Sequence, residues 1–272
     1  MIIEEKNGNV YLKEVANFDL AQTFDCGQCF RFNRTDDGGF CGVAFGKYIK
    51  LNSINDEIVF YNTTAAELES RWIPFFDLER DYGKIIDSFS FDDHLTTAAK
   101  SGSGIRILAQ DPWETLVSFI ISQNNNIPRI KKIIESLCQL CGDKIDENIY
   151  SFPSPERILS LGVEGLSPIK SGFRAKYIID AAEKVSSRAI VLDELKGIDE
   201  AVAREKLKTI KGVGDKVASC VMLFGLGYLG SFPIDVWVKR VLEKYYSSDF
   251  DPSVFGEYAG IAQQYLFFYE RG

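Results

Sequence analysis

The sequence predicts an α+β fold, with an antiparallel β-sheet in residues 1–90 and an all-helical domain in residues 91–272. In the first part, short runs of β-branched and aromatic residues follow one another, separated by turns that contain glycine, asparagine or aspartate. Beyond residue 62, apolar residues recur at helical spacing behind residues that cap helices. We therefore expect two domains that meet near residue 90.

The β-sheet is predicted to begin with a hairpin around Asn7-Gly8, a dipeptide that suits the left-handed backbone of a two-residue turn. Strands are expected at residues 10–12, 30–32, 40–45, 48–51 and 58–61. Their short, even spacing is typical of a meander, in which each strand pairs with the next one along the chain.

The helices are predicted from their start signals. Thr64 and Glu67 have the spacing of a capping box, and Asp111-Pro112 places a cap before a first-turn proline. Further helices are expected from Ile127, from Ser154 and over residues 173–185 and 253–268. Four amides at residues 123–126 separate two of these helices; they are either a polar loop with caps or donors and acceptors for base edges.

Composition narrows the class of protein. The 272 residues are 46% hydrophobic, contain no run of eighteen apolar residues, and begin without the pattern of a signal peptide, so we expect a cytoplasmic protein, nucleoid-associated if prokaryotic, with no membrane partner. A net charge of −8 argues weakly against nucleic-acid binding. Residues 170–216 are nevertheless locally basic, with eleven lysines and arginines.

Six cysteines include two Cys-x-x-Cys pairs, at 26/29 and 138/141, which allow a zinc or redox site. The pairs lie far apart in sequence, and the second fits a helix face on which small thiols pack. Because His94 is the only histidine, a His-rich metal site is excluded. We therefore expect no metal site in the chain, apart from the cation considered below.

Residues 207–220 contain the most unusual pattern. Gly212, Val213 and Gly214 form a tight turn between two helical patterns, and the free N–H groups of such a turn suit a phosphate. Lys216 follows in the first helical turn, where the helix dipole disfavours a cation. Asp235, before another helix, has the position of an ordinary N-cap.

This stretch, IKGVGDKVASC at 210–220 followed by PIDV at 233–236, resembles the helix-hairpin-helix motif and catalytic aspartate of base-excision DNA glycosylases. A lysine at position 216 is typical of the bifunctional members. The stretches CGQCFRF at 26–32, SQNNNIPRI at 122–130 and GIAQQYLF at 260–267 resemble signatures of the 8-oxoguanine DNA glycosylase family. Together they cover nearly the whole chain and imply a helix-hairpin-helix glycosylase fold for its helical domain.

The resemblance implies two catalytic residues. Lys216 would attack the sugar C1′ and form a Schiff base, which requires a neutral amine, and Asp235 would stabilise positive charge that develops on the sugar. From the residues alone, Lys216 could equally be a solvated lysine and Asp235 only a cap.

The resemblance also implies a pocket for a base flipped out of the duplex. Gly27 would offer its carbonyl to the N7 hydrogen that distinguishes 8-oxoguanine from guanine. Gln263 would read the Watson–Crick edge, between Phe267 and Cys220 on the two ring faces. By themselves, Phe267 and Cys220 are more typical of a packed core.

On the DNA side, the resemblance implies that Asn124 fills the vacated space, that Arg129 and Arg174 hold the estranged cytosine, and that Phe173 wedges into the base stack. The hairpin would bind phosphate, with a monovalent cation or calcium on its carbonyls and no other cofactor. The expected partner is double-stranded DNA containing 8-oxoguanine opposite cytosine, bound by a monomer.

Three positions depart from well-known eukaryotic members of the family, which carry histidine at 237, tyrosine at 173 and often proline at 211. Here these residues are Trp237, Phe173 and Lys211. They affect the expected details of phosphate contact and wedge stacking, not the reaction.

Three alternatives stay open at the level of sequence. The first is a monofunctional alkylbase or other DNA glycosylase that uses Asp235 only. The second is a non-catalytic helix-hairpin-helix DNA-binding protein, in which Lys216 contacts phosphate. The third is a Cys-x-x-Cys metal or redox protein.

Overall fold

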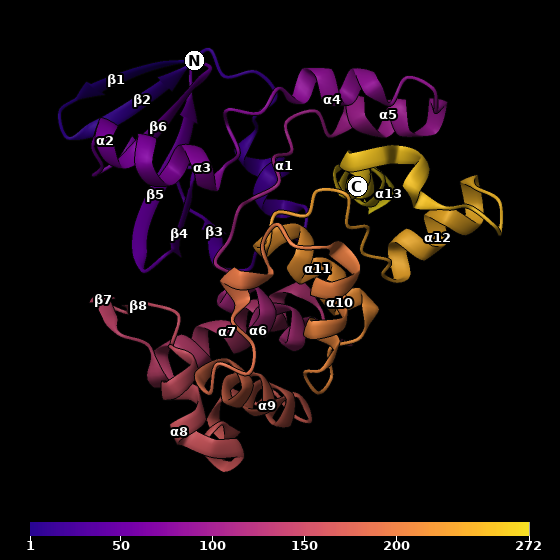
Figure 1. The fold of residues 1–272 in the computed structure, drawn as a ribbon. Coiled ribbons are helices and arrows are strands. Elements are labelled where there is room, and N and C mark those ends of the chain that lie inside the picture. The colour runs from indigo at the N-terminus through magenta and orange to yellow at the C-terminus, as the bar shows by residue number, and fades with distance from the viewer. Residues whose placement is uncertain (272) are drawn as a thin grey trace.

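The computed structural model describes residues 1–271 and confirms the predicted α+β class. An antiparallel sheet lies at the N-terminal end, and most of the chain beyond it is helical (Figure 1). The strands of this sheet are β1 (Ile2–Lys6), β2 (Asn9–Lys13), β3 (Phe32–Arg34), β4 (Phe40–Ala44), β5 (Lys47–Ile54) and β6 (Glu57–Tyr61).

The helical domain also contains a small hairpin of β7 (Lys144–Asp146) and β8 (Ile149–Tyr150). No helix in the described chain is both long and apolar enough to span a lipid bilayer. The helices are α1 (Leu20–Asp25), α2 (Ala65–Glu67), α3 (Ile73–Phe75), α4 (Tyr82–Ser88), α5 (Asp93–Ser101), α6 (Pro112–Ser122), α7 (Ile127–Cys141), α8 (Pro155–Gly165), α9 (Arg174–Ser186), α10 (Glu200–Lys208), α11 (Asp215–Gly225), α12 (Val236–Tyr245) and α13 (Ala259–Arg271).

The order of the strands corrects the predicted meander. The sheet runs β1-β2-β6-β5-β4-β3, so β2 pairs with β6 and not with β3. Val10 pairs with Phe60 and Leu12 with Ile58, and all four side chains are buried in one core. Burial of these shared apolar faces, and not the distance along the chain, selects the partner of β2.

Local signals worked well at the turn of the first hairpin and less well at two other boundaries. Asn7 and Gly8 both have positive φ angles, 53° and 73°, as the turn requires. The third strand starts at Phe32, where its pairing with β4 begins, and Phe30 lies buried in the loop that turns at Gly27. The last helix starts at Ala259 and not at residue 253, because Gly256 has φ 65° and interrupts the helical turn before it.

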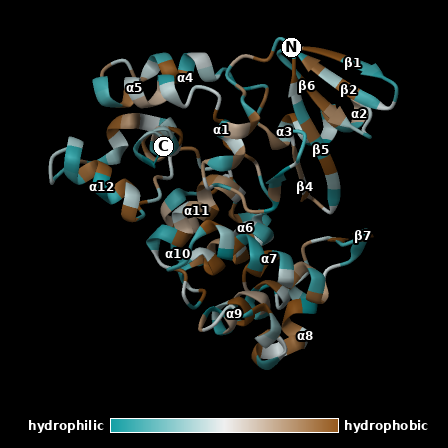
Figure 2. Ribbon diagram, turned by 180° about the vertical axis from the view of Figure 1, so that it is seen from behind, coloured by the Kyte–Doolittle hydropathy of each residue, from teal (hydrophilic) through white to brown (hydrophobic). Residues whose placement is uncertain are grey.

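Two hydrophobic cores organise the molecule. One lies beneath the sheet and consists mainly of residues between Val10 and Leu78. The other extends through the helices and includes Cys26 and Phe30 from the loop after α1. The helices carry bands of both hydrophobic and hydrophilic residues, as expected for amphipathic helices around a core (Figure 2). The expected domain boundary at residue 90 stays a prediction.

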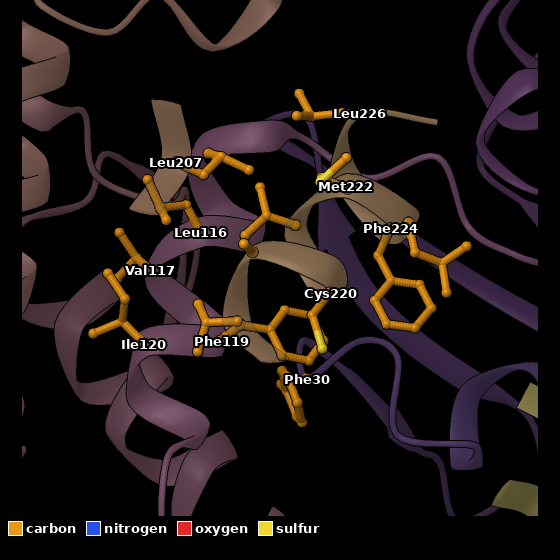
Figure 3. Close-up of a cluster of buried hydrophobic side chains, with 14 of the residues drawn as sticks. Phe30, Leu116, Val117, Phe119, Ile120, Leu207, Cys220, Met222, Phe224 and Leu226 are labelled. Carbon is orange, nitrogen blue, oxygen red and sulfur yellow. The ribbon is translucent and has the colours of Figure 1, made fainter. Parts of the chain in front are cut away.

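The centre of the helical core is the contact between α6 and α11. Residues 217–225 of α11 are all buried. In Figure 3, Phe119 of α6 and Cys220 of α11 lie close together beside Phe30. The helix that carries Lys216 is therefore held firmly by apolar packing along its length.

Candidate active site

Lys216 lies at the start of α11, one residue after Asp215. Its side-chain nitrogen Nζ is 3.4 Å from Ser122 Oγ, a weak hydrogen bond, and 5.1 Å from the centre of the Phe119 ring. Within residues 1–271, no carboxylate lies within ion-pairing distance of Nζ. The lysine is half-buried and faces an aromatic ring, so it is not a fully solvated side chain.

Asp235 caps α12, as its position in the sequence predicts. Its Oδ1 atom accepts hydrogen bonds from the backbone N–H groups of Trp237 at 2.9 Å and Val238 at 2.8 Å. Both bonds end on one oxygen atom of the carboxylate. The other oxygen takes no part in the cap, so the residue has an acceptor available for a second role.

One cavity brings these two residues together with the predicted base-binding residues. It encloses about 320 Å³, part of it open to solvent. Its walls come from the loop after α1, the helices α6, α11 and α13, and the segment before α12. The lining residues are Cys26, Gly27, Phe119, Lys216, Cys220, Phe224, Pro233, Asp235, Gln263, Gln264 and Phe267.

Two features of this cavity suit a ligand with polar edges and flat faces. The Gln263 side chain is only 4% exposed, yet its Oε1 atom has no hydrogen-bond partner in the described chain. Gly27 has φ 78°, and a Cβ atom placed on it would lie 3.5 Å from the Phe267 ring. A buried amide without a partner costs free energy unless a ligand satisfies it, which favours Gln263 as a recognition group.

Cys220 is buried on the opposite helix, α11. Burial raises the pKa of its thiol to about 11, although the charge of Lys216 acts in the other direction. The neutral thiol therefore presents an apolar, polarisable surface to the cavity and is a poor nucleophile at neutral pH.

Sequence reasoning missed several wall residues, above all Phe119 and Gln264. Phe119 belongs to a helix whose apolar residues all resemble core positions, and no pattern separates the one that meets Lys216. Gln264 is 2% exposed, beside Gln263. A polar pair inside a buried helix was the available signal, since glutamine is seldom buried without a reason.

The four residues predicted for the opposite base and the wedge lie together, apart from the cavity. Asn124, with φ 47°, is exposed in the α6–α7 connection, Arg129 is exposed in the first turn of α7, and Phe173 is 51% exposed at the start of α9. Arg174 is buried and donates to the carbonyl oxygens of Gln123, Asn124 and Ser171. Burial, and secondarily the nearby charge of Arg129, lowers the pKa of Arg174.

These contacts make Arg174 a support for the Asn124 loop in this conformation. Most of its N–H groups are already used by backbone carbonyls, whereas the exposed Arg129 is not engaged in this way. Of the two arginines predicted to hold a base, Arg129 is therefore the one that extends to solvent.

The predicted phosphate-binding hairpin is a tight turn in which Gly212 has φ 79°. The N–H of Val213 donates to the Ile210 carbonyl at 3.0 Å, so this group is not free for a phosphate. The N–H groups of Gly212 and Gly214 have no partner in residues 1–271. The free donors of the hairpin are therefore the N–H groups of Gly212 and Gly214.

The six cysteines are all free thiols. In the described part of the chain, no three His, Cys, Asp or Glu side chains gather as a metal site would require. Cys26 and Cys138, one from each Cys-x-x-Cys pair, are buried, and burial raises the pKa of each thiol to about 12. Such thiols pack as apolar groups, which weakens the case for a redox protein.

Comparison with known proteins divides the chain into two matched parts. Residues 10–116 match the family model for the N-terminal domain of 8-oxoguanine DNA glycosylase, and residues 117–254 match that of HhH-GPD superfamily base excision DNA repair proteins. The chain belongs to the 8-oxoguanine DNA glycosylase family. The part that matches the HhH-GPD superfamily, residues 117–254, contains the hairpin, Lys216 and Asp235.

Several relatives agree with this membership. An N-glycosylase/DNA lyase of Saccharomyces cerevisiae is 39% identical over 66% of this chain and 52% of its own length. The N-glycosylase/DNA lyase OGG1 of Arabidopsis thaliana is 30% identical over 92% of this chain and 77% of its own. The chain thus matches about half the length of the yeast relative.

A solved structure extends the similarity over the whole fold. The 8-oxoguanine glycosylase/lyase of Clostridium acetobutylicum, in complex with double-stranded DNA containing cytosine opposite 8-oxoguanine, is 38% identical with a TM-score of 0.94. The match covers 100% of this chain and 98% of that one. The arrangement of sheet and helices is therefore shared with a protein that binds damaged DNA.

Proposed function

We propose that this protein is a bifunctional DNA glycosylase and lyase that excises 8-oxoguanine from double-stranded DNA in base excision repair. The observation that carries the proposal is the single cavity that contains Lys216, Asp235, Gly27, Gln263 and Phe267, drawn from four distant stretches of the chain. The names of the relatives, N-glycosylase/DNA lyase and 8-oxoguanine glycosylase/lyase, support it.

The cavity supports a simple order of recognition. A base flipped out of the duplex enters between Phe267 and Cys220, and its Watson–Crick edge meets the unpartnered amide of Gln263. The carbonyl of Gly27 then accepts the N7 hydrogen of 8-oxoguanine. Guanine has a lone pair at N7 instead, and two acceptors facing each other repel.

The chemistry begins at Lys216. Its neutral amine attacks C1′ of the deoxyribose, the bond from C1′ to the base breaks, and the base leaves with a proton. The sugar ring then opens to a Schiff base between Nζ and C1′. Loss of a C2′ proton expels the 3′ phosphate by β-elimination, and water releases the enzyme. The carboxylate of Asp235 stabilises the positive charge on the sugar during the first step.

On the DNA side, the Asn124 side chain fills the space that the flipped base leaves, and Phe173 enters the neighbouring stack. Exposed Arg129 donates to the acceptors of the estranged cytosine, while Arg174 supports the loop at Asn124 through its hydrogen bonds to backbone carbonyls. The free N–H groups of Gly212 and Gly214 bind backbone phosphate; the hairpin carbonyls would hold a monovalent cation or calcium, which would supply positive charge next to the phosphate. The protein acts as a monomer, in the cytoplasm.

The test uses duplexes with 8-oxoguanine opposite each of the four bases. We expect release of the base, strand cleavage and a covalent adduct trapped by borohydride, with cleavage opposite adenine at least several-fold slower than opposite cytosine. Lys216→Gln abolishes the adduct and the strand cleavage while DNA affinity stays close to wild type. If none of the four duplexes released the base, 8-oxoguanine would be refuted as the substrate.

Two other results would change part of the proposal. Base release without any trapped adduct would favour a monofunctional glycosylase that uses Asp235 only. Equal rates opposite cytosine and adenine would remove the proposed role of Arg129 in selecting the opposite base.

A further inference from the structure

Three of the four segments that carry the catalytic and base-binding residues meet at one buried junction outside the cavity; the loop of Gly27 is the fourth. Helix α11 contributes Ser219, the segment before α12 contributes Ser231, and α13 contributes Gly260. Ser219 is 5% exposed and Ser231 is fully buried. None of the three lines the cavity.

Each junction residue lies within four positions of a functional residue on its own segment. Ser219 lies between Lys216 and Cys220 on α11, and Ser231 precedes Asp235 by four residues. Gly260 precedes Gln263 by less than one helical turn. A shift at the junction therefore moves the attacking amine relative to the carboxylate and the amide.

Close backbone packing joins α13 to the segment before α12. The Gly260 N–H donates to the Leu229 carbonyl at 2.7 Å. A Cβ atom on Gly260 would lie 2.5 Å from the Ser231 carbonyl oxygen, so only glycine allows this approach. The Ser231 hydroxyl in turn donates to the Ser219 carbonyl at 3.3 Å, which joins the segment to α11.

Arg204, on α10, binds both serines at once. Its Nη1 atom donates to Ser219 Oγ at 2.5 Å and its Nη2 atom to Ser231 Oγ at 3.4 Å. Nη2 also donates to Glu200 at 2.8 Å, one turn earlier on the same helix. The planar guanidinium fixes the two hydroxyls relative to each other, which the single point charge of a lysine does not do.

We infer that Arg204 is a positioning residue, which keeps Lys216 in register with Asp235 and Gln263 without touching the substrate. This inference rests on the proposed function. Excision requires all three groups in one geometry, and a misplacement of about 1 Å can cost about 100-fold in rate. Attack on an abasic site that is already open requires Lys216 alone.

The comparison of these two reactions provides the test. Arg204→Met keeps the apolar stem and removes the guanidinium. We expect its single-turnover rate of 8-oxoguanine excision to fall by about 10-fold to 100-fold. Borohydride trapping on a duplex with a preformed abasic site, and the Kd for a stable abasic-site analogue, should stay close to wild type. Arg204→Lys should give an intermediate ratio of excision to trapping.

Glu200→Gln is the matched control, because Glu200 binds the same guanidinium but lies outside the junction, and both rates should be unchanged. If Arg204→Met does not fold, Ser231→Ala replaces it, and a lower ratio of excision to trapping still supports the inference. An unchanged ratio in the folded variant overturns it, as does an equal loss of both reactions. A wild-type protein that traps abasic sites but releases no 8-oxoguanine would refute the proposed function itself.

Discussion

Replacement of Gly212 by alanine should lower both the stability of the fold and its affinity for DNA. Gly212 has φ 79°, and a Cβ atom there would lie 2.3 Å from Cδ2 of Tyr177 and 2.5 Å from its Cγ. These are atoms of an aromatic ring near the backbone of α9, and not the end of a flexible chain. The ring must therefore move, or the hairpin must.

The expected cost has two parts. The left-handed backbone costs an alanine about 1–2 kcal/mol. Forcing extra volume against the Tyr177 ring adds about 1–3 kcal/mol. Together they predict a loss of about 2–5 kcal/mol in the free energy of unfolding.

Gly197→Ala is the control that separates these parts. Gly197 also has a positive φ, 72°, but no atom lies within 4 Å of its Cβ position. It should therefore lose only the backbone cost, about 1–2 kcal/mol. Urea unfolding of the three proteins measures the difference, and DNA titrations at several salt concentrations measure the phosphate contact. Equal stability losses in both variants, or unchanged DNA affinity in Gly212→Ala, would refute the reasoning.

Three further predictions concern single side chains. Burial raises the pKa of Glu114 to about 7, above its ordinary 4.5. The stability that the protonated carboxyl provides is therefore present below pH 4.5 and lost as the pH rises through 7. Urea unfolding should show the free energy of unfolding fall by about 3 kcal/mol over this range in the wild type and not in Glu114→Gln. Asp235→Asn should keep the helix cap and lose base excision, whereas Asp235→Ala should lose about 1 kcal/mol of stability as well. If the asparagine variant excised the base at the wild-type rate, Asp235 would be a helix cap without a catalytic role. At pH 8, iodoacetamide should label half-buried Cys41 well before Cys220. Burial raises the pKa of Cys220 to about 11, and only the thiolate reacts. Equal labelling rates, measured by mass spectrometry, would contradict this.

Signals that act within a few residues predicted the helix starts and turns. The caps at Thr64, Asp111 and Asn126 bind the N–H groups three residues later, as their spacing indicates. The boundary of the last helix could not be predicted, because its apolar pattern continues through Gly256, where the backbone leaves the helical conformation. Apolar spacing reports a buried face, not an unbroken helix.

The candidate site was predicted in its parts but not in its surroundings. The resemblance placed Lys216, Asp235 and Gln263 in one site, and the cavity contains all three. It gave no indication of Phe119 beneath the amine or of the Arg204 contacts to the two serines. These residues lie far from the motifs in sequence and look like ordinary helix residues there.

The sequence by itself determined where the chain turns, where most helices begin, and which short motifs carry chemistry, because these depend on groups a few bonds apart. Only the tertiary structure decided that β2 pairs with β6 and that Arg174 supports the loop at Asn124. Each of these outcomes depends on which buried surfaces and polar groups satisfy one another across long stretches of chain. The turn at Gly212 shows both levels: its positive φ favours glycine locally, and the ring of Tyr177 on α9 leaves no room there for a Cβ atom.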